Sequence, residues 1–130
     1  MADATEPTDV RASTDEVLAA AAARSAADLL VAYEATFRRH PGLSHLGPLA
    51  AHHAQHVEAF AQQPVANGRG ARVPRSPRDA LSALAAAESG IRERRVAAAR
   101  AATSGALARA LASAAACQSQ HLVLLRPGRP

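Results

Sequence analysis

Alanine is the feature that most limits what this chain can fold into, because it accounts for 36 of the 130 residues. It is the best helix former, since its side chain loses no rotamer freedom in a helix. The period-two alternation typical of strands is not found in the sequence. Methyl groups fill little space, so helices lined by alanine must pack closely to form a core. We therefore expect one all-α domain with an alanine-rich core.

Breaks in this pattern divide the chain into four expected helices. Ser13 and Glu16 form a capping box that starts the first helix, and Pro41 and Gly42 end it after about Arg39. A linker rich in Pro, Gly and Arg covers 64–77, and Ser76 caps the third helix. The other helices are expected over about 48–62, 77–102 and 106–125. Residues 1–12 are expected to form a disordered acidic arm, 13–126 the helical bundle and 127–130 a tail.

Each helix carries an apolar stripe at three- and four-residue spacing, and polar residues interrupt each stripe at one place. In an antiparallel hairpin, the polar positions of the first two helices lie at similar levels, and so do those of the last two. We expect these side chains to face the core, where they form either a hydrogen-bonded polar layer or a metal site. The candidate residues are Glu34, His53, His56, Glu88, Gln118 and His121.

Other placements compete with this interpretation. Glu34 and Glu88 each have an arginine four residues later, the spacing of an exposed ion pair. His52 is expected to face solvent, as are the arginines of the third helix, including Arg95. Cys117 is expected to be a small packing residue. Whether the two hairpins join by a crossover or a short return is left open by the length of the linker.

The order of the polar positions resembles the ferritin-like di-metal bundles, in which Glu, Glu-x-x-His, Glu and Glu-x-x-His follow one another along four helices. RRHPGLSHLGPLAAHHAQHVEAF (38–60) and ALSALAAAESGIRERR (80–95) are also similar to ferritin-like domain proteins of actinobacteria. The resemblance implies a ferritin-like four-helix bundle built from two helical hairpins. It also implies that the start of this chain could follow a missing leader, which would make the protein exported or a lipoprotein.

The di-metal motif is degenerate, because His53 and Gln118 stand where the resemblance implies bridging glutamates. Too few carboxylates remain to balance two metal ions, whereas imidazole suits a single Zn(II) or Fe(II). We expect a structural or interaction module with no bound cofactor. The alternatives are a mononuclear metal-binding or redox variant, with one divalent transition metal ion, and an Arg-rich helical binder of acidic partners.

Composition limits the remaining functions. All 15 basic residues are arginine, and aromatic residues make up only 2%, so stacking platforms for specific nucleic-acid binding are not expected. The net charge of +4 permits weak, non-specific attraction of polyanions. No apolar run is long enough for a membrane span, and the start lacks a signal-peptide pattern, so we expect a cytoplasmic protein. A homodimer is plausible for so thin a core.

Overall fold

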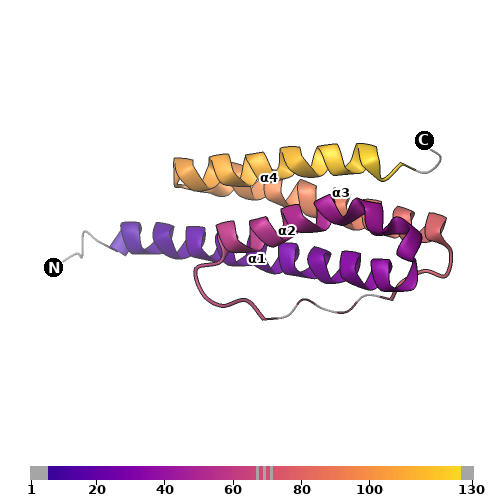
Figure 1. Cartoon of the computed structure of the whole chain (residues 1–130). Helices are drawn as coiled ribbons and strands as arrows, with labels where there is room; N and C mark the ends of the chain where they lie inside the picture. The colour runs from indigo at the N-terminus through magenta and orange to yellow at the C-terminus, as the bar shows by residue number, and fades with distance from the viewer. Residues whose placement is uncertain (1–5, 67, 69, 71, 127–130) are drawn as a thin grey trace.

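The computed structural model of the chain describes residues 6–66, 68, 70 and 72–126, with side chains from residue 14 onward. Four α-helices lie side by side in an elongated molecule (Figure 1). They are α1 (Glu6–Arg39), α2 (Gly47–Phe60), α3 (Pro77–Ala101) and α4 (Gly105–Leu124), and the short 3-10 helix η1 (Pro41–Leu46) joins the first two. These residues include no strand, so the all-α prediction is confirmed.

The helices form two antiparallel hairpins, α1 with α2 and α3 with α4 (Figure 1). The connection between the hairpins runs back along α1. Val65 packs beside the Ala23 cluster near one end of that path, and at the other end His40 Nε2 donates to the Pro74 carbonyl at 2.8 Å. Between these points Gly68 lies against the backbone of Ala27, where a methyl group would overlap it. The question left open by the sequence is therefore settled as a crossover, and α2 and α3 run parallel.

The observed helix boundaries correct two expectations. α1 begins at Glu6 rather than Ser13, so residues 6–12 of the expected disordered arm are helical, and residues 1–5 lie outside the described residues. α2 ends at Phe60, because the chain becomes extended at Ala61. The cap predicted at Ser76 is confirmed, since its hydroxyl accepts from the backbone N–H of Asp79. The tail at 127–130 also lies outside the described residues.

A second cap joins the two hairpins. Both oxygens of the Asp15 carboxylate accept from backbone N–H groups in the turn before α4, one from Thr103 and one from Ser104, each at 2.9 Å. Ser104 in turn caps α4 by accepting from Leu107 N. The acidic beginning of the sequence thus contributes a side chain that holds the α3–α4 turn.

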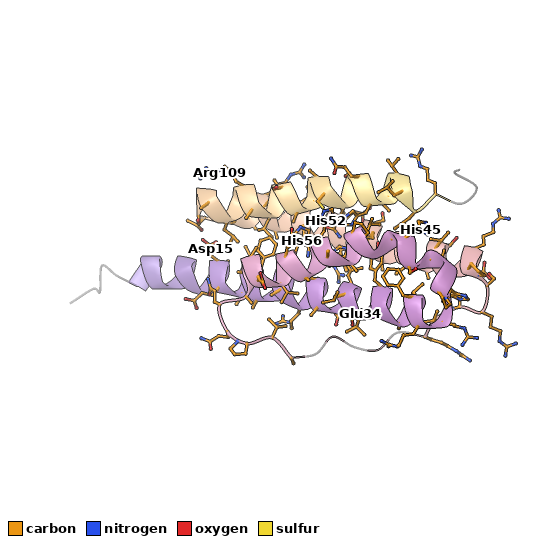
Figure 2. All side chains as sticks on the ribbon, viewed as in Figure 1. Asp15, Glu34, His45, His52, His56 and Arg109 are labelled. Atoms are coloured by element: carbon orange, nitrogen blue, oxygen red, sulfur yellow. The ribbon has the colours of Figure 1, made fainter. Side chains whose placement is uncertain are left out.

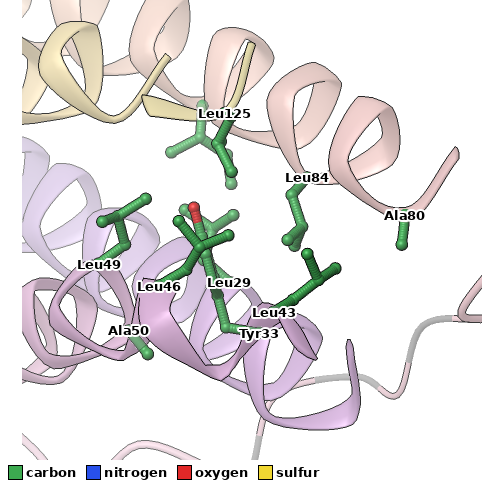
Figure 3. Close-up of a cluster of buried hydrophobic side chains, with 10 residues drawn as sticks. Leu29, Tyr33, Leu43, Leu46, Leu49, Ala50, Ala80, Leu84 and Leu125 are labelled. Carbon is green, nitrogen blue, oxygen red and sulfur yellow. The ribbon is translucent and has the colours of Figure 1, made fainter. Parts of the chain in front are cut away.

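The buried core is divided into two clusters rather than the single core expected. The larger cluster contains most of the leucines and is shown in Figure 3, and the smaller one is formed mainly by alanine with Phe60 and Leu111. On each of α2, α3 and α4, polar residues lie between the positions that belong to the two clusters. A layer of buried polar side chains therefore separates the two parts of the core.

The buried face of α1 is rotated by one position from the expected stripe. Leu29 and Tyr33 are buried, whereas Glu34 is exposed (Figure 2). The stripes predicted for α2 and α4 are largely observed, with Leu49, His53 and Phe60 buried on one and Leu111, Gln118 and His121 on the other. Within the described residues, no helix is long and apolar enough to cross a membrane.

Candidate metal centre

Glu88 is the centre of the buried polar layer, and its side chain has no solvent exposure. Its Oε1 accepts from Tyr33 Oη at 2.8 Å, His53 Nε2 at 2.5 Å and His121 Nδ1 at 2.9 Å. Its Oε2 accepts from Gln118 Nε2 at 3.1 Å. One donor comes from each of α1 and α2 and two come from α4, so this carboxylate joins all four helices.

The protonation states follow from burial and these hydrogen bonds. Burial by itself would raise the pKa of Glu88, but the hydrogen bonds from His121 and His53 outweigh it and hold the pKa well below its usual range. Burial lowers the pKa of His53, so this imidazole is neutral at pH 7. Burial, together with the charge of Glu88, raises the pKa of Tyr33, which keeps its hydroxyl protonated. Glu88 is therefore a carboxylate, and its donors Tyr33 and His53 are neutral.

A buried arginine balances this charge through an amide. Arg95 is only 2% exposed, and its Nη1 donates to Gln118 Oε1 at 2.9 Å. Gln118 thus receives a hydrogen bond from the cation and donates one to the carboxylate, which leaves both ions paired through it. We call Tyr33, His53, Glu88, Gln118, Arg95 and His121, through its Nδ1, the inner layer.

Three further donor atoms converge on the other side of His121. His52 Nδ1 lies 2.9 Å from His121 Nε2, and Cys117 Sγ lies 3.4 Å from His121 Nε2 and 3.6 Å from His52 Nδ1. We call His52, Cys117 and His121 the outer triad. His121 is buried, whereas His52 and Cys117 are half-buried. The triad combines one residue of α2 with a Cys-x-x-x-His pair on successive turns of α4 (Figure 2 labels His52).

The inner layer fixes the tautomer of the shared histidine. A carboxylate can only accept, so His121 Nδ1 carries the hydrogen that faces Glu88. In the neutral ring, His121 Nε2 then presents a lone pair to the outer triad. Histidine ligands of metal ions are commonly oriented by a carboxylate in this way, which also makes the ligating nitrogen more basic.

The spacing of the outer triad suits a transition metal ion. Bonds of ~2.1 Å to nitrogen and ~2.3 Å to sulfur in a tetrahedral zinc site separate the nitrogens by ~3.4 Å and nitrogen from sulfur by ~3.6 Å. The two sulfur–nitrogen distances, 3.6 Å to His52 Nδ1 and 3.4 Å to His121 Nε2, are close to the expected separation. The nitrogen–nitrogen distance of 2.9 Å is that of a hydrogen bond, so a bound ion would replace the shared proton and move the rings apart by about half an ångström.

The cysteine must lose a proton to become a ligand. Burial, followed by the charge of Glu88, raises the pKa of the Cys117 thiol, so the free chain holds it as a thiol at pH 7. A metal ion displaces this proton when it binds, because the thiolate is the ligand form.

A bridged pair of metal ions does not fit these residues. Glu88 is the one carboxylate in the cluster, since Glu34 is exposed. Its two oxygens already receive hydrogen bonds from Tyr33, His53, His121 and Gln118. The di-metal arrangement that the resemblance implies requires further carboxylates to bridge and to balance charge, and the described residues do not supply them here.

The structure brings together four of the six predicted site residues, namely His53, Glu88, Gln118 and His121. Glu34 was wrongly placed, because α1 turns it away from the core. His56 is half-buried and lies beside Arg95, whose Nη1 is 3.4 Å from its Nδ1. It also packs against Phe60 (Figure 2 labels His56), so it borders the inner layer without reaching Glu88.

Sequence reasoning misplaced His52 and Arg95, gave Cys117 no part in either cluster and overlooked Tyr33. His52 was expected in solvent, but its ring is nearly parallel to that of His121, with centroids 5.1 Å apart. Arg95 was expected on a solvated face, and Cys117 was expected to be a packing residue. Two spacings in the sequence indicated that these residues share a helix face. Arg95 lies seven residues, or two helical turns, after Glu88, and Cys117 lies four residues, or one turn, before His121.

Comparison with known proteins identified no relative of this chain. Neither a protein-family model, nor a curated protein, nor a solved structure matches the chain with significant similarity. The all-α fold and the arrangement of the two clusters therefore rest on the geometry itself.

Proposed function

We propose that this protein is a ferritin-like four-helix bundle that binds one divalent transition metal ion, Zn(II) in preference to Fe(II), at His52, Cys117 and His121. The observation that carries the proposal is the convergence of two imidazole nitrogens and one sulfur within 3.6 Å. One thiolate and two imidazoles form a borderline-soft ligand set, which favours Zn(II) over Fe(II). Three protein ligands leave a fourth position for water or an exogenous group.

The ferritin-like part of the proposal is supported by topology and by the location of the polar residues. Two hairpins are joined by a long crossover, as in ferritin-like folds. The polar layer lies at the middle of the bundle and draws on all four helices. In this proposal Glu88 is retained as an orienting carboxylate for His121 rather than as a metal ligand.

A purely structural module is the second candidate, and one observation favours it. The Glu88 carboxylate receives four hydrogen bonds and needs no ion to be satisfied. A buried network of this kind also specifies how helices are aligned, because any other register leaves polar groups unpaired. Metal titration separates the two candidates.

The test is calorimetric titration of Zn(II) into reduced, tag-free protein, repeated with Co(II) to detect thiolate coordination by absorption. We expect one ion per chain, bound tighter than ~1 μM. Cys117→Ser should weaken binding at least ~100-fold, since the sulfur ligand is replaced by a hydroxyl. His52→Ala should also weaken it.

The matched controls are His56→Ala and His45→Ala, which remove imidazoles outside the triad. Both should bind zinc as the wild type does. If the wild type binds no zinc at 100 μM, the bundle is a structural module. If His56→Ala removes binding while Cys117→Ser preserves it, the ligands lie elsewhere.

A further inference from the structure

A cavity of about 570 Å³ opens between α1 and α3 and is separate from the outer triad. Its volume lies within the range of ~300–1,000 Å³ typical of small-molecule sites. Most of its wall is apolar, with Leu18, Ile91 and Leu111 as the larger side chains and alanines between them. Alanine side chains fill little of the space between two helices, so an alanine-rich wall leaves room for a cavity.

Arg95 contributes a buried guanidinium to the wall of this cavity. Its hydrogen-bond acceptors in the described structure are neutral, namely Gln118 Oε1, His56 Nδ1 and the Ala22 carbonyl. Its Nε is buried and has no hydrogen-bond partner. Burial lowers the pKa of Arg95 to about 10, so it remains a cation at neutral pH. A buried N–H without an acceptor costs ~1–3 kcal/mol. The side chain of Arg95 lines the cavity, so an anion bound there is stabilised by its positive charge.

The remaining charges of the cavity are also mostly positive. Arg24 and Arg94 line it and are exposed, and Asp28 is its one acidic lining residue. The charge of Arg95 is balanced by Glu88 through Gln118, so Arg24 and Arg94 against Asp28 leave the cavity an excess of one positive charge. The apolar wall and the arginines together define a ligand with an apolar chain and a negative head.

We propose that this cavity binds an amphipathic carboxylate of the fatty-acid type, with its chain along the alanine wall and its head toward Arg95, Arg24 and Arg94. A guanidinium matches a planar carboxylate through two parallel hydrogen bonds. The proposal does not depend on metal binding, because none of these residues belongs to the outer triad.

The experiment measures binding of sodium decanoate to the metal-free full chain by calorimetry, with decanol and acetate as comparison probes. Decanoate should bind with a stoichiometry of one and at least ~10-fold tighter than either probe, which corresponds to ~1.4 kcal/mol. Equal affinity for decanol would show an apolar groove without recognition of the head, and equal affinity for acetate would show surface attraction alone. Either result overturns the proposal, as does no detectable binding at 1 mM.

Two sets of variants locate the site. Ala21→Phe fills the cavity from an exposed lining position and should abolish binding, whereas Ala112→Phe, an equally exposed position on α4, should leave it unchanged. Arg24→Gln with Arg94→Gln should weaken decanoate several-fold and leave decanol unchanged. Arg95→Met should weaken it more. If Arg95→Met fails to fold, the two exposed arginines and Ala21→Phe still decide the outcome. Unchanged binding in Ala21→Phe contradicts the assigned cavity.

Discussion

His121 joins the inner layer to the outer triad, and the two regions differ in how far the central carboxylate of one and the ligand atoms of the other are hydrogen-bonded. In the inner layer, the Glu88 carboxylate receives four hydrogen bonds and is fully buried. In the outer triad, two nitrogens and a sulfur lie close together, and each pair can form only one hydrogen bond. His52 and Cys117 are also half-buried.

This difference indicates a structural role for the inner layer and a binding role for the outer triad, although both contain histidine. A buried carboxylate that accepts four hydrogen bonds holds helices together and gains little from an ion. Ligand atoms that converge on one point and are joined only by a shared proton and weak sulfur contacts can exchange these for an ion. The same imidazole serves both regions, since its Nδ1 belongs to the inner layer and its Nε2 to the outer triad.

The largest effect should come from removing the centre of the inner layer. Glu88→Ala leaves the Tyr33, His53 and Gln118 donors without their acceptor and Arg95 without its balancing charge. Breaking a buried charge network in this way costs ~3–5 kcal/mol. Urea unfolding followed by circular dichroism measures it, with Glu34→Ala as the exposed control. A loss below ~1 kcal/mol would show that the inner layer does not hold the fold.

A milder substitution of Glu88 should weaken zinc binding at the outer triad. Glu88→Gln retains the size of the side chain but removes the charge that orients His121. Losing such an orienting carboxylate typically weakens metal affinity ~10–100-fold. Zinc titration of the folded variant measures this effect. Affinity equal to that of the wild type would mean that the two regions are independent despite their shared histidine.

Low pH should destabilise the folded protein through protonation of His56, which borders the inner layer. Burial, followed by the charge of Arg95, lowers the pKa of His56 from 6.5 to about 4. Between these pH values the unfolded chain binds a proton that the folded chain does not, so stability falls as the pH decreases from 6.5 toward 4. The urea midpoint of metal-free protein should therefore decrease less between pH 7 and 5 in His56→Gln than in the wild type. Parallel decreases in both proteins would contradict this assignment.

The smallest effect is expected from the outer triad in the absence of metal. Cys117→Ala removes a half-buried thiol that makes only weak hydrogen bonds to His52 and His121. The metal-free variant should differ from wild type by no more than ~1 kcal/mol in unfolding free energy. Adding zinc should stabilise the wild type and leave the variant unchanged, because only the wild type binds the ion. A large loss without metal would instead assign Cys117 to the core.

Local residue patterns determined most of what could be predicted about this chain. The number of helices, the cap at Ser76 and the buried faces of α2 and α4 follow from propensity and periodicity. His53 was correctly predicted to face the core, because it continues the stripe of Leu49 and Phe60. These features depend on neighbours within one or two helical turns, which the sequence displays directly.

Tertiary packing alone decided which polar residues meet. α1 has alanines on several sides, so its pattern fits more than one rotation, and contact with the other helices selected Tyr33 over Glu34. His52 and Cys117 lie beside the buried stripes of their own helices. Cys117 lies one turn from His121 on α4, but only the approach of α2 to α4 brings His52 to this pair. A sequence specifies positions around each helix, whereas the separation and rotation of two helices depend on every side chain between them. For that physical reason the inner layer was partly foreseeable, whereas the sequence displayed only the Cys117–His121 spacing of the outer triad.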